Sequence, residues 1–153
     1  MSHFIPGTVA TCAVALDYIV ATQENTIGEI IHQSATLVLT DTAVSPVLGL
    51  NLSDGTITGF VTGVYSFQYI IICENDPSYM GSAFGLYDNL ISGDILLPGS
   101  TASYPSTGTI ISNVTLVGQT IYVASSASVI SIRNLVDADV TVYSTNLKII
   151  RIH

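Results

Sequence analysis

One short stretch constrains the fold of this chain more than any other: GVYSFQYIIIC, at Gly63–Cys73. Aromatic and apolar side chains occupy every second position, namely Tyr65, Phe67, Tyr69, Ile71 and Cys73. Because side chains alternate between the two faces of a strand, this set points to one side along the whole segment. The segment has no proline and no charge, and it is rich in β-branched and aromatic residues. It therefore predicts a strand in the interior of a sheet.

Charge is scarce in the whole chain. Only 9% of the 153 residues are charged and 48% are hydrophobic, whereas a soluble monomer normally has about a quarter charged residues. We therefore expect other copies of the chain to cover part of the apolar surface. The net charge is −8 with three basic residues. This balance argues against nucleic-acid or anionic-membrane partners, since both bind clustered Lys and Arg.

The rest of the sequence predicts strands in one domain. Short apolar stretches alternate with turn residues, as is typical of a sandwich or barrel. The best helix candidate, 24–33, contains Gly28 and β-branched residues, so a strand is an equally good interpretation. We expect about ten strands in two packed sheets: 9–20, 35–40, 47–52, 56–61, 65–73, 82–87, 109–117, 120–124, 129–135, 140–143 and 147–152. Turns are expected at 54–55 and 118–119, and 98–108 reads as a long connection.

The N-terminal segment and the two cysteines leave alternatives open. Residues 1–21 contain an apolar run without a positive region, and Asp17 interrupts it, so they predict neither a secretory signal nor a membrane span. Cys73 is expected to be a buried free thiol. Cys12 is either an unpaired thiol or the source of a disulfide between subunits in an oxidising setting.

The segment GTITGFVTGVYSFQYIIIC resembles the strand of spaced glycine, aromatic, phenylalanine and tyrosine residues in TNF-like and complement-type globular heads. Within that superfamily it looks most similar to the trimeric domains of the Bacillus exosporium, the head of the collagen-like spore glycoprotein and its small basal-layer partner. The likeness continues through 82–117 and 128–153 and covers residues 35–153 in all. A collagen-like Gly-X-Y tract is absent.

The resemblance implies a TNF-like jelly-roll β-sandwich of about ten antiparallel strands, assembled as a homotrimer. It divides the chain into an N-terminal extension, 1–34, which supplies extra strands or an arm between subunits, and a jelly-roll domain, 35–153. It also implies that the aromatic strand lies in the trimer core or interface, through Tyr65, Phe67, Tyr69 and Ile71. The spore surface, or another extracellular layer, is the location that it implies.

Catalytic chemistry finds no support in the sequence. The histidines are His3, His32 and His153, two of them near the termini, and none has the spacing of a triad or a metal site. We therefore expect no enzyme activity and no cofactor. Loop carboxylates are weak candidates for Ca²⁺, which prefers several hard oxygens, although solvated loop acids explain them better: Glu74, Asp76, Asp88, Asp94, Asp137 and Asp139.

Tyrosines give the one hint of a ligand. The chain has eight tyrosines and no tryptophan, and three of them lie in or beside expected loops and could contact a glycan: Tyr79, Tyr87 and Tyr104. A structural role for these rings is the better interpretation, because sugar stacking usually uses Trp as well.

Three functional hypotheses follow. The first is a structural, non-enzymatic homotrimeric building block of a bacterial spore surface, the exosporium, or of a similar extracellular layer. The second is the carbohydrate- or receptor-binding trimeric tip of a surface fibre. The third is a filament subunit linked through disulfides of Cys12. The expected partners are further copies of the chain and other spore-surface proteins or glycans.

Overall fold

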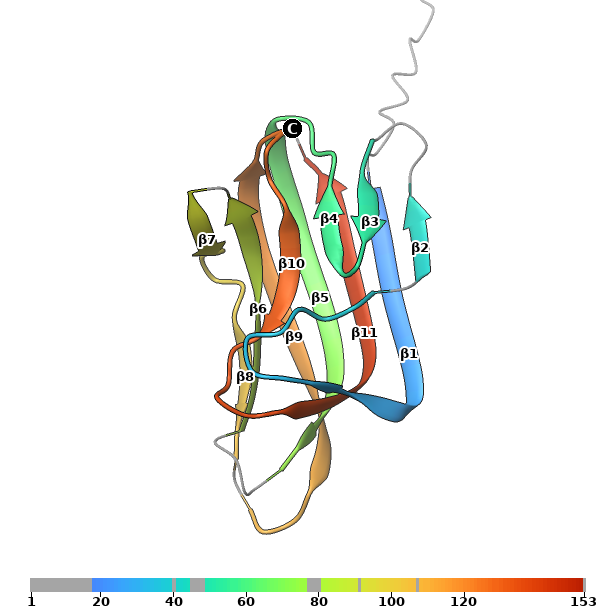
Figure 1. Cartoon of the computed structure of the whole chain (residues 1–153), viewed down its shortest axis with the longest axis vertical. Coiled ribbons are helices and arrows are strands. Elements are labelled where there is room, and N and C mark those ends of the chain that lie inside the picture. The colour runs from blue at the N-terminus through green and yellow to red at the C-terminus, as the bar shows by residue number, and fades with distance from the viewer. Residues whose placement is uncertain are drawn as a thin grey trace, which may run out of the picture.

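The computed structural model describes residues 18–39, 41–44, 49–76, 81–90, 92–106 and 108–152, and these form strands and loops without a helix (Figure 1). The strands are β1 (Tyr18–Ile31), β2 (Asp41–Val44), β3 (Asn51–Ser53), β4 (Thr56–Thr58), β5 (Gly63–Asn75), β6 (Gly81–Leu90), β7 (Gly93–Leu96), β8 (Ala102–Pro105), β9 (Ser112–Ala124), β10 (Ile130–Asn134) and β11 (Val140–Arg151). The all-β class predicted from the sequence is confirmed. None of the described residues forms a helix that could cross a membrane.

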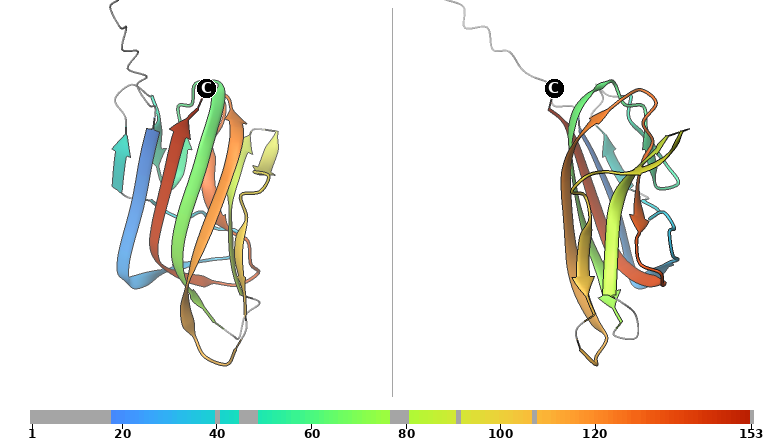
Figure 2. Two further views of the ribbon diagram at one scale, coloured as in Figure 1. Left: turned by 180° about the vertical axis from the view of Figure 1, so that it is seen from behind. Right: turned by 90° about the vertical axis from the view of Figure 1, so that its left-hand side faces the viewer.

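Two antiparallel sheets pack face to face. The first has five strands in the order β2-β1-β11-β5-β9, and the second has the order β3-β4-β10-β6-β7, with β8 also paired to β6. Figure 2 shows the five-stranded sheet from its outer side (left) and the two layers nearly edge-on (right). The apolar core lies between the layers, as expected for a sandwich whose strands bury every second side chain.

The aromatic segment forms most of β5, with β11 on one side and β9 on the other. Its aromatic side chains point into the sandwich, where Tyr65, Phe67 and Tyr69 have no exposed surface. Phe60 packs edge-on against Tyr65, with the ring centroids 5.1 Å apart and the planes at 88°. The interior strand predicted from the alternation is therefore confirmed, and it extends two residues further, to Asn75.

The turn expected at 118–119 is wrong. Strand β9 runs without interruption from Ser112 to Ala124, and Gly118 lies opposite Tyr69 in the ladder. A Cβ atom on Gly118 would lie 2.1 Å from Tyr69 Cζ. This glycine leaves room for a buried ring rather than allowing the chain to turn.

Other expected boundaries also change. The segments 140–143 and 147–152 belong to one strand, β11, because its pairing with β1 and β5 continues past an irregularity near Ser144. In the expected strand 35–40, the described residues 35–39 are not a strand, since they make only an isolated bridge between Thr36 and Arg133. The connection 98–108 includes β8. The two-residue turn at 54–55 is confirmed and joins β3 to β4.

Strand β1 occupies much of the segment assigned to an N-terminal extension. It pairs with β11 from Tyr18 to Glu24 and again from Glu29 to Ile31, with a register shift between. The ambiguous segment 24–33 is thus mainly strand. Residues 1–17, and with them Cys12, lie outside the described residues, so the division at residue 34 stays a prediction.

Candidate functional site

The main candidate site is the outer face of the five-stranded sheet, the side turned away from the core. Strand alternation brings its residues to one surface, and we define the outer face by them: Tyr18, Val20, Val64, Gln68, Ile70, Ile72, Val117, Gln119, Ile121, Val123, Lys148 and Ile150. Ile121 and Val123 are each 63% exposed. An exposed apolar group of this extent is typical of a surface that other protein covers.

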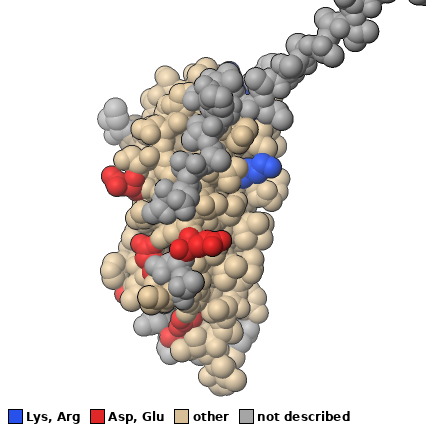
Figure 3. Space-filling model, turned by 90° about the vertical axis from the view of Figure 1, so that its right-hand side faces the viewer, with Lys and Arg blue, Asp and Glu red and all other residues tan. Residues whose placement is uncertain are grey.

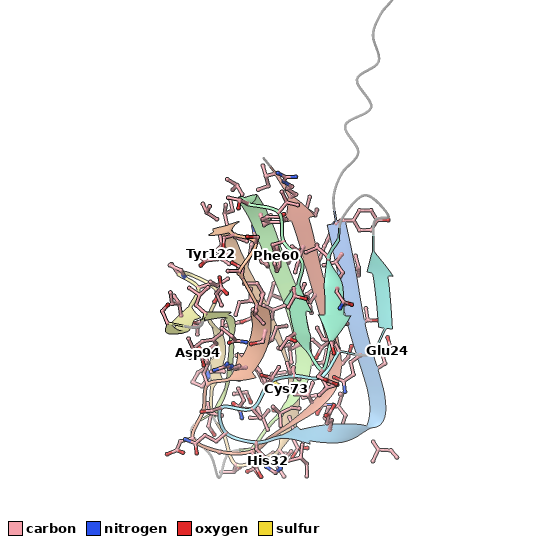
Figure 4. The ribbon with its side chains drawn as sticks, turned by 45° about the horizontal axis from the view of Figure 1, so that its top comes forward. Glu24, His32, Phe60, Cys73, Asp94 and Tyr122 are labelled. Carbon is pink, nitrogen blue, oxygen red and sulfur yellow. The ribbon has the colours of Figure 1, made fainter. Side chains whose placement is uncertain are left out.

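Charge is sparse on and around this face. Lys148 is the one charged residue of this set, while Glu24, labelled in Figure 4, lies at its margin on β1 and Glu74 follows Ile72 on the same side of β5. Figure 3 views the molecule from the side of β1 and β2 and shows that most of the described surface there is uncharged, with scattered acidic groups. Lys148 has no acidic partner among the described residues. The outer face is thus available for apolar contacts over most of its width.

The aromatic residues predicted for the trimer core or interface belong to the core of the single chain. Tyr65, Phe67, Tyr69 and Ile71 are completely buried between the sheets. The Tyr69 hydroxyl lies 2.7 Å from the carbonyl oxygens of both Phe84 and Ser100 and accepts a hydrogen bond from the Ala102 N–H at 3.0 Å. Burial raises the pKa of Tyr69 well above its usual range. These side chains hold the two layers together, and a role at an interface stays a prediction.

The structure brings three of the six candidate carboxylates together. Glu74, Asp76 and Asp139 line a cavity of about 250 Å³. Asp139 contacts His32, which lies at the end of the sandwich away from Phe60 (Figure 4). Glu74 accepts a hydrogen bond of 2.9 Å from Tyr143, which raises the pKa of that phenol. Asp139 lies 2.9 Å from His32 Nδ1. The described residues contain no group of three or more acidic, His or Cys side chains that could hold a metal ion, so Ca²⁺ binding stays an untested prediction.

Asp88 has a structural role instead. Its carboxylate is completely buried and accepts three hydrogen bonds, from Tyr122 at 3.0 Å, Ser128 at 2.7 Å and the Val129 N–H at 2.9 Å. Burial, followed by the contact with Asp88, raises the pKa of Tyr122. The carboxylate therefore fastens the loop between β9 and β10 to β6.

The two remaining acids lie apart from each other. Asp94 pairs with Arg133 at 2.5 Å, and Asp137 is exposed in the loop before β11. The guanidinium of Arg133 also lies 4.8 Å from the centre of the Tyr87 ring. One face of this ring is therefore already occupied by a cation.

The other residues predicted to bind glycan or form disulfides have different surroundings. Tyr104 on β8 is 42% exposed, and Tyr79 lies outside the described residues. Cys73 is a buried free thiol. Its pKa is raised to about 11, because the effect of burial outweighs the opposing effect of a hydrogen bond with Ser82. Glycan binding and a disulfide through Cys12 stay predictions.

Comparison with solved structures identifies the architecture. The Eiger TNF of S. frugiperda aligns with a TM-score of 0.70 over 90% of this chain and 94% of that chain, at 16% identity. The globular domain of zebrafish complement 1qA aligns at 0.68 over 90% and 98%, with 11% identity, and murine APRIL at 0.63 over 90% and 99%, with 10% identity. The chain has the TNF-like jelly-roll fold. No protein-family model and no curated protein matches the sequence.

Identities this low make the TNF-like jelly roll a statement about fold alone. Within this fold, reasoning from the sequence expected an apolar surface but did not locate it on the five-stranded sheet, and it missed one contact of Arg133. The outer face could have been anticipated from the second parity of β5, which turns apolar at Ile70, together with the apolar parity of β9. The contact of Arg133 with Tyr87 had no sequence signal, because the two residues lie on separate strands that become neighbours only in the sheet.

Proposed function

We propose that this chain is a structural, non-enzymatic building block that assembles as a homotrimer in an extracellular layer, specifically the exosporium of a bacterial spore. The single observation that carries the proposal is the exposed apolar outer face of the five-stranded sheet. Association would remove this face from water at a gain of roughly 25 cal/mol per Å² of apolar surface. The few charged residues there leave little desolvation to oppose the contact.

The resemblance of the β5 region to TNF-like and exosporium heads supports a trimer as the oligomeric state and the spore surface as the location. A chain with 9% charged residues is poorly suited to remain a dispersed monomer. It is well suited to a layer in which neighbouring copies cover one another. The proposed partners are further copies of this chain and other proteins or glycans of the same layer.

Native mass measurement tests the oligomer. The expected mass is about 48 kDa, three times the 16.1 kDa of the chain. A monodisperse monomer at micromolar concentration contradicts the proposal. Ile70→Lys on the outer face should dissociate the trimer, because it places an ammonium in the covered surface. Ile95→Lys is the matched control, since Ile95 is similarly exposed, at 45% against 39%, but lies on β7 of the other sheet.

Location needs its own experiment. An antibody raised against the chain should label the surface of intact spores of the source organism. Label confined to the spore interior, or to vegetative cells, contradicts the assignment to the exosporium but leaves the trimer intact.

A further inference from the structure

Every bond that a trypsin-like protease could cut lies in or at the end of a paired strand. Such enzymes cleave after Lys or Arg, and the chain has three such residues, Arg133, Lys148 and Arg151. The first lies on β10 and the other two lie on β11. Proteases normally cut exposed loops and termini. Here the loops carry no site of this kind, because residues 1–132 contain neither Lys nor Arg.

The backbone around Arg133 is held on both sides. On one side, β10 pairs with β6, and Arg133 lies opposite Gly85. On the other side, Arg133 forms a bridge with Thr36. The N–H of Asn134, which belongs to the bond that would be cut, donates to the Ala35 carbonyl at 3.1 Å. An extended peptide is recognised through its main-chain hydrogen-bonding groups, and here those groups are already in use.

The side chain of Arg133 is held as well. Its guanidinium lies 2.5 Å from an Asp94 carboxylate oxygen and donates to the Asn89 side-chain oxygen at 2.6 Å. It also lies 4.8 Å from the centre of the Tyr87 ring, and only 20% of the side chain is exposed. The specificity pocket of trypsin binds a cationic side chain through a carboxylate. The Arg133 cation can enter such a pocket only after these three contacts break.

Lys148 combines an exposed side chain with a protected backbone. Its strand, β11, lies between β1 and β5 in the middle of the five-stranded sheet. Lys148 pairs with Val20 on one side and with Gln68 on the other. Ile149, which follows the bond that would be cut, is completely buried. A protease can therefore reach the ammonium of Lys148, but it reaches the backbone only after β11 leaves the sheet.

Arg151 is the last residue of the same strand. It pairs with Tyr65 of β5, and the N–H of Ile152 donates to the Val64 carbonyl at 2.8 Å. Cleavage after Arg151 would remove only the last two residues of the sequence. A cut at this site therefore leaves all the strands of the sandwich in place.

We propose that this placement protects the folded chain from proteases that cut after Lys or Arg, so that it persists in surroundings that contain such enzymes. Cleavage requires β10 or β11 to open, and both strands carry completely buried core residues, such as Ile132 and Ile149. Opening of core strands costs close to the free energy of global unfolding. Proteolysis follows the small population of the open state. The protection comes from the fold of one chain and does not depend on the proposed trimer.

Digestion with trypsin, followed by intact-mass spectrometry, tests the proposal. The unmodified chain should lose at most its last two residues. Thr109→Lys places a site in the exposed loop between β8 and β9, and cleavage there should be at least about a hundredfold faster than cleavage after Lys148. In Tyr69→Phe, cleavage after Lys148 should accelerate by the same factor by which urea titration shows the unfolded population to grow.

Ile70→Lys separates the effect of the fold from the effect of assembly. It is the variant expected to dissociate the trimer, and it adds a cleavage site on β5, between β11 and β9. The dissociated chain should resist trypsin at Lys148 and at position 70 as well as the unmodified chain resists it at Lys148.

The outcomes distinguish this proposal from the trimer. Cleavage of the unmodified chain after Arg133 or Lys148 at a rate close to that of Thr109→Lys, whether both are fast or both are slow, overturns the protection by strand placement. Rapid cleavage of the dissociated Ile70→Lys chain also overturns it, because assembly would then be the cause. An unmodified chain that is monomeric and resistant supports the protection and contradicts the proposed trimer.

Discussion

The hydroxyl of Tyr69 joins the two sheets through a single oxygen atom, and removing it gives the sharpest prediction for stability. In Tyr69→Phe, the Ala102 N–H loses its acceptor at 3.0 Å, and the carbonyls of Phe84 and Ser100 lose a donor at 2.7 Å. One phenol proton serves one carbonyl at a time, so two hydrogen bonds are lost together. Each contributes about 1 kcal/mol, and an orphaned buried donor adds a penalty of about 1–3 kcal/mol. We expect the free energy of unfolding to fall by about 3–5 kcal/mol.

Tyr65→Phe is the matched control for this change. Tyr65 lies on the same strand and face and is equally buried, but its hydroxyl makes one hydrogen bond, to the carbonyl of Val61 at 2.8 Å. Val61 is 51% exposed, so water can replace the lost donor, and we expect a loss of only about 0.5–1 kcal/mol. Urea unfolding followed by far-UV circular dichroism measures both variants, at one protein concentration because association adds to apparent stability.

Alkaline pH provides a second readout for Tyr69. Burial raises its pKa in the folded chain above the ordinary value of 10.0, so the unfolded chain ionises first. The neutral phenol contributes to the free energy of unfolding, and this contribution is fully present below pH 10 and is lost as the pH rises beyond it. Tyr69→Phe should lack this part of the alkaline decline. If Tyr69→Phe loses no more stability than Tyr65→Phe, the hydroxyl does not hold the sheets together and the reasoning is refuted.

Three further changes test other parts of the core. Asp88→Asn should lower the free energy of unfolding by about 1–3 kcal/mol, because an amide satisfies the three donors less well. The control Asp137→Asn, at an exposed loop position, should change it by less than about 0.5 kcal/mol, and equal effects of the two variants in urea unfolding would contradict the structural role of Asp88. Gly118→Ala should be destabilising because its Cβ would lie 2.1 Å from the buried ring of Tyr69. The loss of stability should be smaller in a Tyr69→Leu background, and additive losses in this double-mutant cycle would argue against the contact between Gly118 and Tyr69. The Cys73 thiol has a pKa of about 11 in the folded chain against 9.0 when unfolded, so the free energy of unfolding should fall by about 2–3 kcal/mol between pH 9 and 11. If a Cys73→Ala variant shows the same fall over that interval, another group is responsible.

Local patterns in the sequence predicted strands well where one face is buried. The alternation in Gly63–Cys73 matches the buried parity of β5 residue for residue. The same reasoning failed at Gly118, because a glycine in a strand indicates a turn unless its neighbour across the ladder is known. That neighbour, Tyr69, is far away in the sequence, and its ring occupies the space of the missing side chain.

The candidate acids show the same limit. Composition and loop position put Asp88 in one group with Glu74 and Asp139, yet their surroundings differ completely. Asp88 is enclosed with three donors, whereas Glu74 and Asp139 border an open cavity. Whether a carboxylate is buried and holds a loop in place or stays solvated depends on the groups that the fold brings near it, and those groups come from distant segments.

The sequence by itself determined the all-β class and the inward face of β5, and its lack of charge predicted that part of the apolar surface is covered by other protein. These properties follow from the alternation of side chains within a segment and from the composition of the whole chain, and neither depends on which strands pair. Only the tertiary structure decided where the exposed apolar face lies. The order β2-β1-β11-β5-β9 brings the first described strand beside the last one and puts β9 at the opposite end of the same face. The exposed apolar outer face exists because of that long-range pairing, since its residues come from strands that are far apart in the sequence.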